Sequence, residues 1–451
     1  MPILPIDAGR YGSDEIKKIF DERKRLEYEL EFEASAAESQ SEIGIIPASA
    51  AKEIAQKARS GKITVQRVRE LEAVSEHDTA AMVESISELC NDGAKPWVHY
   101  GLTSYDVVDT SISMQMRDSL LIIEPKVAKL AAMLADKAAQ YKDIPAVGRT
   151  HGQHASIISF GLKFAVWASD MADHVNRIRE MKRRVLVCKT LGVVGTGSLM
   201  GSRALEVQTL VAKKLNLYPI DAATQVVSRE RHAEFIFCLA LIASTLDKIA
   251  VEIRNLQRTE IGEAAEPFKE GQMGSSAVPV KRNPIKSERI SSLARILKGM
   301  LSVSLDNVAL WHERDLSNSA NERFTIPMTV ILLDEMLNSM TKVMSGLKVD
   351  DKRIAANLEL TKGQIYAEFV LDALVKKGMP RFDAYRALQR TAFGAAEKDI
   401  HFLDVLIGDK EISSRVSKEE LKAIFSPKNH LAASTQIIDN VIKMVREVCR
   451  T

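Results

Sequence analysis

Residues 236–260 read IFCLALIASTLDKIAVEIRNLQRTE, and this stretch decides the fold of the chain. Apolar side chains recur in it every three or four residues, the spacing that gathers them on one face of an α-helix. These apolar positions are Ile236, Leu239, Ala243, Leu246, Ile249, Ile253 and Leu256. Charged residues such as Lys248, Glu252 and Arg254 stand between them. The stretch therefore predicts an amphipathic helix about twice as long as the usual three or four turns.

The spacing of proline predicts that other helices are similarly long. Inside a helix, proline removes a hydrogen bond and clashes with the preceding turn. Four long stretches lack it: 146–218, 220–266, 285–326 and 328–379. Residues 162–187 and 290–310 also repeat the apolar spacing of the first stretch.

Helices of this length bury little surface within one chain, so they usually pack into bundles, often with copies of themselves. We therefore predict an all-α fold of three helical domains, with strand signals weak and short. The N-terminal domain would cover residues 1–105, a central long-helix bundle 106–360 and the C-terminal domain 361–451. The central bundle would assemble with other subunits into a multi-helix core.

Composition favours a cytoplasmic protein. The formal charge is +2 and basic residues are spread along the chain, which argues against nucleic acid or a membrane surface as the main partner. The four cysteines lie far apart and are typical of a reducing compartment. The N-terminus lacks the basic and apolar regions of a signal peptide, and the longest uncharged apolar run, 235–246, is too short to span a bilayer.

One segment, residues 266–284, breaks the helical pattern with the sequence EPFKEGQMGSSAVPVKRNP. Its glycines and prolines forbid a continuous helix, and long irregular connections are usually functional or disordered. Within 271–284 stand hydroxyl, cationic and amide side chains: Ser275, Ser276, Lys281, Arg282 and Asn283. Asn283 and Pro284 resemble a helix N-cap and first turn, which would aim free N–H groups at an anion. A flexible crossover is the alternative on composition alone.

Four further polar clusters weigh toward function. They are residues 76–78 (EHD), 97–106 (WVHYGLTSYD), 148–154 (GRTHGQH) and 313–323 (ERDLSNSANER). Each has an ordinary alternative: a satisfied histidine–acid pair, a helix N-cap, or salt bridges from Arg314 and Arg323 to neighbouring acids. The H-x-x-H spacing of the third cluster lacks the pairing and cysteine partners of a zinc site, so we predict no metal.

A glycine motif competes with this interpretation. Gly195, Gly197 and Gly201 approach the dinucleotide fingerprint, and Asp221 follows at about the expected distance of 20 residues. That fingerprint needs a βαβ setting, whereas the surrounding sequence predicts helices. The G-x-S-x-G elbow of serine hydrolases is also missing. A nicotinamide oxidoreductase therefore remains the less favoured alternative.

Taken together, the clusters resemble the fumarase/aspartase superfamily and, within it, the adenylosuccinate lyase family. The superfamily motif is GSSAVPVKRNP at 274–284. The family motifs follow in order from residue 10: RYGS at 10–13, HD at 77–78, HYGLTSYDVVDT at 99–110, RTHGQH at 149–154, TQVVSRERH at 224–232 and ERDLSNS at 313–319. The chain departs from the usual residues at Glu76, Val278 and Val280, positions that shape the pocket rather than carry protons.

This resemblance implies an all-helical C–N lyase that eliminates fumarate from adenylosuccinate, giving AMP, and from SAICAR, giving AICAR. It implies Ser275 as general base and His151 as general acid. The succinyl carboxylates would bind Thr103, Ser104, Ser276, Lys281 and Asn283. The ribose-phosphate end would bind Arg10, Tyr11, Arg289, Arg314, Ser319 and Arg323. The nucleotide would contact His77, Asp78 and Gln225, which also orient His151.

The resemblance also implies the cofactor and assembly of the enzyme. A preorganised set of cations and N–H groups stabilises the dianionic intermediate, so no metal or organic cofactor is needed. The active sites would lie in a homotetramer, each completed by residues from three subunits. A structural role without catalysis, to which this superfamily has been recruited in the lens, is disfavoured because Ser275 and His151 are present.

Overall fold

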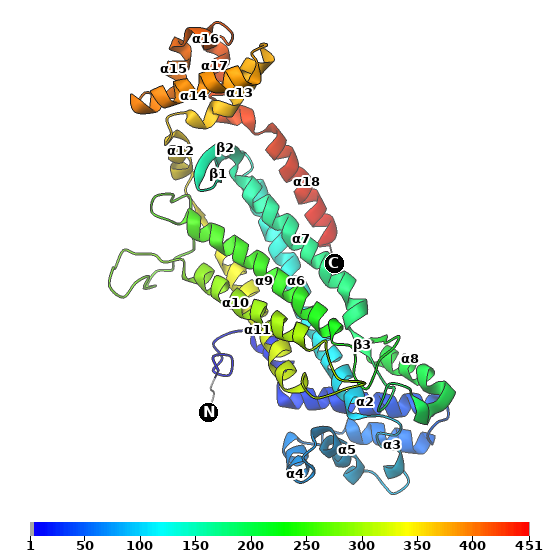
Figure 1. The fold of residues 1–451 in the computed structure, drawn as a ribbon. Coiled ribbons are helices and arrows are strands. Elements are labelled where there is room, and N and C mark those ends of the chain that lie inside the picture. The colour runs from blue at the N-terminus through cyan, green and yellow to red at the C-terminus, as the bar shows by residue number, and fades with distance from the viewer. Residues whose placement is uncertain (1–3, 451) are drawn as a thin grey trace. The chain divides into compact units, whose positions relative to one another are not determined.

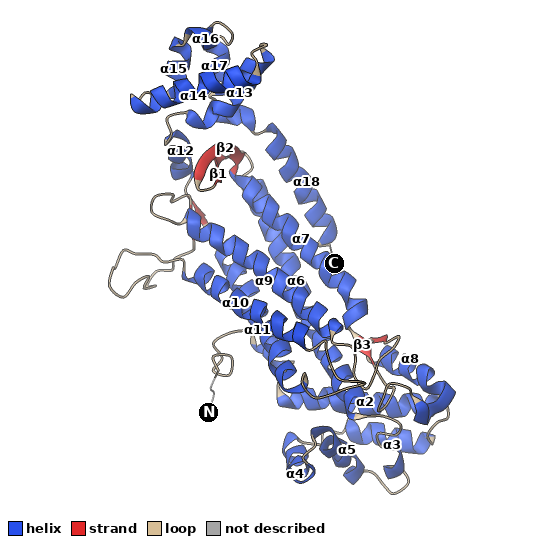
Figure 2. Cartoon of the chain, viewed as in Figure 1, coloured by secondary structure: helices blue, strands red, loops and turns tan. Residues whose placement is uncertain are grey.

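The computed structural model describes residues 4–450, and their secondary structure is almost entirely helical (Figure 2). The described residues form 18 α-helices, four short 3-10 helices and six strands, of which four have only two residues. This confirms the predicted all-α class. Within residues 4–450, every helix is too short or too polar to cross a lipid bilayer.

The chain divides into two compact units, each built from three separate segments. Unit 1 comprises the chain up to Lys126 together with His174–Ser244 and Ser292–Asn338. Unit 2 comprises Val127–Asp173, Thr245–Ser291 and the chain from Ser339 onward. Five long helices contribute a segment to each unit: α6 (Ser104–Gln140), α7 (Phe160–Val185), α9 (Glu230–Leu256), α10 (Ile285–Asp306) and α11 (Ser319–Ser345).

Unit 1 adds shorter elements to its segments of the long helices. In chain order these are α1 (Asp14–Lys18), α2 (Glu22–Glu42), α3 (Ala48–Ala58), α4 (Val65–Ser75), α5 (Asp78–Leu89), η1 (Lys95–Trp97), β3 (Val187–Cys188), η2 (Ser198–Arg203), α8 (Ala204–Lys214) and β4 (Tyr218–Pro219). Polar side chains fix the starts of several of these helices, as when Asp21 accepts a hydrogen bond from the N–H of Lys24 at 2.7 Å.

Unit 2 adds a hairpin, a second small sheet and the C-terminal helices (Figure 1). These are β1 (Pro145–Thr150), β2 (Gln153–Ser159), β5 (Ala264–Ala265), β6 (Lys348–Val349), α12 (Asp351–Glu359), η3 (Gln364–Tyr366), α13 (Ala367–Lys376), α14 (Arg381–Glu397), α15 (Phe402–Gly408), α16 (Lys410–Ser413), α17 (Lys418–Ile424), η4 (Pro427–His430) and α18 (Ala432–Val448). Both β1–β2 and β5–β6 pair antiparallel.

The apolar stripe of 236–260 forms the buried face of α9. All seven predicted positions are at most 3% exposed. Salt bridges join α9 to α7 in each unit: Arg184 to Glu234 in unit 1, and Lys163 to Glu252 in unit 2. Two further predicted helices, at 162–187 and 290–310, correspond to α7 and α10 within five residues at each end.

Two prolines lie inside long helices, although the long helices were expected in stretches that lack proline. Pro125 lies inside α6, a helix of 37 residues, and Pro327 lies inside α11. Each proline removes one intrahelical hydrogen bond. The remaining bonds and the burial of neighbours such as Ile123 and Val127, both fully buried, outweigh that loss.

Candidate active site

Unit 1 contains a cavity of about 430 Å³ that gathers most of the residues predicted at the nucleotide end. Six of the predicted residues line it: His77, Asp78, Ser104, Arg314, Ser319 and Arg323. They come from the junction of α4 and α5, the start of α6, and the start of α11 with the loop before it. Residues far apart in the sequence thus meet at one surface, as in the ion pair between Asp78 and Arg323, which are 245 positions apart.

His77 is the N-cap of α5. Its Nδ1 atom accepts a hydrogen bond from the N–H of Ala80 at 3.2 Å and lies 3.9 Å from Oδ1 of Asp78. Glu76, immediately before it, ends α4 in the left-handed conformation with a φ of 51°. The tight turn at Glu76 directs the chain so that both His77 and Asp78 reach the cavity wall.

Asp78 lies between two arginines. Its Oδ2 atom is 3.2 Å from Nη2 of Arg25 on α2 and 3.3 Å from Nη2 of Arg323 on α11. Its Oδ1 atom accepts a hydrogen bond from the N–H of Thr79 at 2.7 Å. Burial favours the neutral carboxyl group, but this hydrogen bond and the two guanidiniums outweigh it and lower the pKa of Asp78. Asp78 therefore stays negative and holds Arg323 at the cavity.

Thr103 and Ser104 lie at the start of α6. They also line a second cavity of about 520 Å³, which His77 and His99 share. The N–H of Thr103 donates to Oδ2 of the buried Asp106 at 2.9 Å, and the buried Lys189 pairs with the same carboxylate. These contacts fix the helix start that presents both hydroxyls.

Arg314 has an unusual set of partners. Its Nη1 atom donates to Oε1 of Gln225 at 2.5 Å, which brings two predicted residues together. Its guanidinium lies over the ring of Tyr105, 3.8 Å from the centroid. Within residues 4–450 it makes no ion pair, so the alternative of local salt bridges to Glu313, Asp315 or Glu322 is wrong for Arg314.

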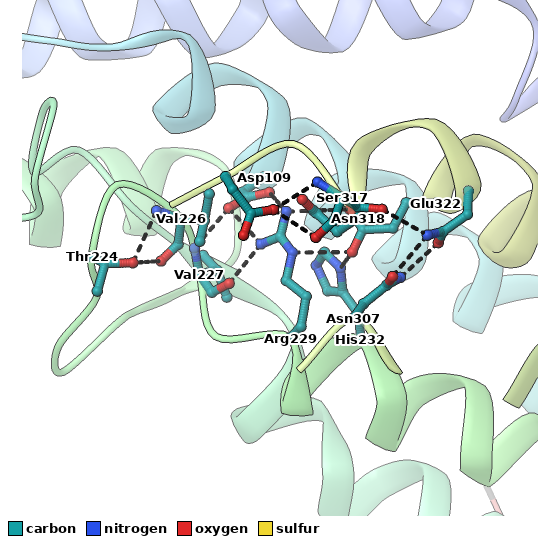
Figure 3. Close-up of polar contacts among 12 residues, drawn as sticks. Asp109, Thr224, Val226, Val227, Arg229, His232, Asn307, Ser317, Asn318 and Glu322 are labelled. Atoms are coloured by element: carbon teal, nitrogen blue, oxygen red, sulfur yellow. Dashed lines mark hydrogen bonds and ion pairs between the residues drawn. The ribbon is translucent and has the colours of Figure 1, made fainter. Parts of the chain in front are cut away.

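A buried ion network is centred on Arg229 (Figure 3). The guanidinium of Arg229 also lies 5.6 Å from the ring centroid of Tyr105. The fully buried Arg229 donates two hydrogen bonds to Asp109, at 2.9 and 3.0 Å, and its Nε atom lies 3.0 Å from Oε1 of Glu322. His232 approaches the same Glu322 oxygen at 3.2 Å. Burial opposes the charge of Arg229, but the carboxylates of Asp109 and Glu322 outweigh it and raise the pKa of Arg229. The charges compensate one another and fix α6, α9 and α11 around the site.

Arg10 and Tyr11 precede a turn that packs against α11. The N–H of Ser13 donates to Asp334 at 2.8 Å. At Gly12, with a φ of 77°, an added Cβ would lie 2.5 Å from the side chain of Ile331. Glycine is therefore required for this approach, which attaches the predicted phosphate ligands Arg10 and Tyr11 to the helix that carries Ser319 and Arg323.

The loop with Ser275 belongs to unit 2 and extends away from the ends of α9 and α10 (Figure 1). Its tip is a compact turn. The Ser275 hydroxyl oxygen accepts hydrogen bonds from the N–H groups of Ala277 and Val278, at 3.3 and 3.2 Å. The N–H of Lys281 donates to the carbonyl of Val278 at 3.1 Å. Donors aimed at the serine oxygen are what an alkoxide needs.

Gly274 brings the two arms of the loop together. A Cβ added at Gly274 would lie 2.0 Å from the carbonyl oxygen of Lys281 and 3.1 Å from the ring of Phe268. Only glycine permits this approach. The backbone next to Ser275 therefore touches the backbone of Lys281, while the side chains of Ser276 and Lys281 are exposed.

The start of α10 differs from the prediction. Glu266 accepts hydrogen bonds from the N–H groups of Lys286 and Ser287, at 3.2 and 2.6 Å, and from the Ser287 hydroxyl at 2.6 Å. The expected N-cap at Asn283 is therefore wrong, because a buried carboxylate from 17 residues earlier takes those N–H groups. They are not free for a substrate anion.

His151 lies at the tip of the β1–β2 hairpin, exposed and with a φ of 53°. A bidentate salt bridge anchors this hairpin: Arg149 donates to Glu263 at 3.1 and 2.6 Å. Asn357 on α12 donates to the same fully buried carboxylate at 2.8 Å. Glu263 stands three residues before Glu266, so one short segment holds both the histidine hairpin and the start of α10.

Ser275 and His151, the predicted proton-transfer pair, both lie in unit 2. Among residues 4–450, no hydrogen bond joins Ser275 to His151. The loop residues Ser276, Lys281 and Asn283, and Arg289 on α10, lie in unit 2 with His151, whereas the cavity residues lie in unit 1.

The competing glycine motif does not form a dinucleotide site. β3 and β4 do pair in parallel with α8 between them, but over two residues only, and the described residues add no further strand to make the larger parallel sheet of a dinucleotide-binding fold. Gly195, with a φ of 81°, instead allows a close approach of backbone to backbone. A Cβ there would lie 2.1 Å from the carbonyl oxygen of Ala223.

Arg25 and Tyr105 are two of the cavity residues that sequence reasoning missed. Tyr105 stands inside the motif at 99–110, next to residues that were selected for their hydroxyl groups. Arg25 follows no motif and reaches Asp78 across 53 positions, so nothing in the sequence marks it.

Comparisons with known proteins show the family of the chain. A family model described as "Lyase" matches residues 9–299, and one described as "Adenylosuccinate lyase C-terminus" matches residues 363–441. The chain is 42% identical to the adenylosuccinate lyase of Methanocaldococcus jannaschii, covering 99% of this chain and 96% of that one. It is 41% identical to that of Pyrococcus horikoshii, covering 100% and 99%.

Solved structures share the fold. A fumarate lyase from Mesorhizobium sp. BNC1 superposes with a TM-score of 0.89 at 30% identity, covering 98% of this chain and all of the other. The 3-carboxy-cis,cis-muconate lactonizing enzyme of Pseudomonas putida gives a TM-score of 0.88 at 28% identity, covering 99% and 100%.

Proposed function

The chain belongs to the adenylosuccinate lyase family of the fumarase/aspartase superfamily, and we propose that Ser275 and His151 carry its proton transfers. It is a C–N lyase that eliminates fumarate from adenylosuccinate and leaves AMP. We propose that SAICAR is cleaved in the same way. The observation that carries the proposal is the serine turn, in which two N–H groups point at the hydroxyl oxygen of Ser275.

The first half of the reaction removes a proton from carbon. Ser275, as an alkoxide, takes the proton from the carbon next to a succinyl carboxylate. The electron pair moves into that carboxylate and forms a dianionic intermediate. A serine hydroxyl is a weak base unless its anion is stabilised. The N–H groups of Ala277 and Val278 supply hydrogen bonds to the oxygen, and Lys281 supplies positive charge from the adjoining arm of the loop.

The second half breaks the C–N bond. The electron pair returns to form the carbon–carbon double bond of fumarate, and the departing amino nitrogen of the purine takes a proton from His151. The left-handed conformation of His151 at the hairpin tip presents its ring to solvent, where a substrate can meet it. Salt bridging of Arg149 to Glu263 keeps the hairpin in place.

The remaining residues bind the two ends of the substrate. The hydroxyls of Thr103, Ser104 and Ser276, with Lys281 and Asn283, hold the carboxylates. The cavity of unit 1 takes the nucleotide, where His77, Asp78 and Gln225 contact it and position His151. The phosphate binds Arg10, Tyr11, Arg289, Arg314, Ser319 and Arg323. Arg314 supports this assignment because it faces the cavity without a carboxylate partner.

We further propose a cytoplasmic homotetramer in which three subunits complete each site. The long helices leave large apolar side chains exposed, as at Leu121 (66%), Phe237 (50%) and Phe324 (57%). Exposed apolar side chains on long helices are what a subunit interface would bury. An assembled bundle would cover these side chains and bring Ser275 of one subunit to His151 of another.

The decisive experiment mixes the purified protein with adenylosuccinate and no added cofactor. We expect the ultraviolet absorbance of the purine to change while fumarate and AMP appear in equal amounts. Consumption of NAD(P)H in place of fumarate release would support the oxidoreductase instead. Repeating the assay with SAICAR tests the second substrate.

A further inference from the structure

Tyr105 follows Thr103 and Ser104 directly and lines the same cavity as Ser104. Its side chain is only 6% exposed. Two guanidiniums lie over the ring, that of Arg314 at 3.8 Å from the centroid and that of Arg229 at 5.6 Å. A buried aromatic ring this close to cations stabilises them through the negative charge of its face.

The two arginines differ in how their charge is balanced. Arg229 is fully buried and pairs with Asp109 and Glu322, so its charge is neutralised within the protein. Arg314 makes no ion pair within 4.0 Å of any carboxylate in residues 4–450, and the exposed Asp315 acts on it only at longer range. In the described chain its guanidinium makes one hydrogen bond, to Gln225, and lies over the ring of Tyr105, while its buried Nε atom has no hydrogen-bond partner.

Such an arrangement suits the capture of an anion. A carboxylate beside Arg314 would fix the guanidinium but also cancel its charge, as Asp78 does in part for Arg323. An aromatic ring fixes the guanidinium and leaves its full charge for the ligand. The rigid network of Arg229 in turn holds the ring.

We propose that Tyr105 is a positioning residue for the substrate phosphate: its ring holds the guanidinium of Arg314 at the cavity without neutralising it. This inference rests on the proposed function, in which Arg314 binds the phosphate. Loss of the ring weakens phosphate binding and leaves the proton transfers untouched.

The test compares Tyr105→Leu with Tyr105→Phe in the full-length enzyme. A cation–π contact of ordinary strength corresponds to a change of roughly three- to thirtyfold in affinity. We expect Tyr105→Leu to raise KM for adenylosuccinate by that factor with little change in kcat, and to weaken inhibition by inorganic phosphate equally. Tyr105→Phe, which keeps the ring, should stay close to the unchanged protein. An unchanged KM in Tyr105→Leu would overturn the proposal.

Two comparisons separate positioning from general damage. With succinyladenosine, which lacks the phosphate, Tyr105→Leu and the unchanged protein should have the same kcat/KM. In an Arg314→Gln background, Tyr105→Leu should add little further loss, because the two residues act as one unit. Equal losses on both substrates, or fully multiplicative losses in the double variant, would mean that the ring only supports folding.

The matched control is Tyr28→Leu. Tyr28 is also a buried tyrosine of unit 1, is 4% exposed and has the ammonium of Lys24 at 4.9 Å from its ring centroid, but it lines neither cavity. We expect it to lower stability and leave the KM of the folded enzyme unchanged. A KM increase matching that of Tyr105→Leu would contradict the proposal.

If Tyr105→Leu does not fold, fluorinated phenylalanines at position 105 test whether the charge of the ring face positions Arg314. Fluorination withdraws charge from the ring face and hardly alters its size. KM should rise step by step with each fluorine, and a flat series would overturn the proposal.

If the unchanged protein failed to cleave adenylosuccinate, the proposed function would be wrong. The dissociation constant of AMP, measured by calorimetry on the same series, would still test Tyr105.

Discussion

Ser275 and His151 differ from their neighbours in that each would carry a proton rather than hold a substrate. Positioned acid–base groups typically contribute about 100- to 10,000-fold to a rate. We expect Ser275→Ala and His151→Ala each to lower kcat by at least about 100-fold, measured as fumarate release under saturating substrate. Ser276→Ala is the matched control, and it should raise KM more than it lowers kcat. Turnover that survives either of the first two changes would refute the assigned roles.

His99 gives a prediction for pH. Its Nδ1 atom lies 2.6 Å from the buried carboxylate of Glu33. Burial opposes protonation, but Glu33 outweighs it and raises the pKa of His99 above its ordinary value near 6.5. The pair therefore stabilises the fold fully below that ordinary value, and the stabilisation is lost as pH rises through the raised pKa.

We expect the melting temperature of the unchanged protein to exceed that of His99→Asn most at pH 6. Asparagine suits this comparison because it tolerates the left-handed φ of 58°. Calorimetric scans from pH 6 to 9 should show the difference shrinking. A difference that grows with pH would have the wrong sign for a charged histidine–carboxylate pair.

The buried cysteines give a second prediction from pKa. Burial raises the pKa of Cys188 and of Cys238 to about 12, so neither thiol ionises near neutral pH. A disulfide reagent at pH 8 should leave both unmodified in the native enzyme and react with Cys449, which is partly exposed. All four cysteines should react after denaturation. Rapid native labelling of Cys188 would contradict the burial.

The sequence predicted which side chains lie at the site where their type indicates their role. It predicted less well which residue each of them pairs with. Asp78 and Arg323 were both selected from the sequence, and the structure brings them together. The expected salt bridging of neighbours was wrong, because Glu322 pairs with Arg229, 93 positions away. Tertiary proximity of that kind leaves no periodic signal in the chain.

At the scale of elements, Glu266 determines where α10 begins. A glutamine at this position keeps one acceptor oxygen but turns an NH2 group toward the other donor, and a buried donor left unsatisfied costs about 1–3 kcal/mol. Glu266→Gln should lower the free energy of unfolding by about that amount, as measured in urea. Glu270→Gln changes an exposed acid of the same loop and should cost almost nothing. Equal effects of the two changes would show that capping by Glu266 contributes little.

The helices were predicted well where burial enforces their period and less well at proline. Every apolar position expected on α9 is buried, because a stripe at that spacing can be buried only by a helix. The spacing of prolines gave no sign of α6, which continues through Pro125. One lost hydrogen bond in 37 residues is a small cost, and no local rule weighs it against packing.

At the scale of the whole molecule, the spacing of apolar residues does not distinguish a helix face that is buried within the chain from one that another subunit would bury. Ile236 is fully buried and Phe237, the next residue, is 50% exposed, although both belong to the same apolar run. The predicted division into three domains and the assembly therefore stay predictions. Light scattering should give four times the chain mass of 50.0 kDa for the active enzyme. A fully active monomer would contradict the shared site.

Subunit complementation tests the central claim, that Ser275 and His151 of one site come from different chains. Inactive Ser275→Ala and His151→Ala proteins are mixed, their subunits are exchanged under mild denaturant, and fumarate release is measured. Hybrid tetramers should regain part of the activity, because some of their sites combine an intact serine from one chain with an intact histidine from another. Hybrids that form, as shown by differently tagged subunits copurifying, and yet stay inactive would contradict the account.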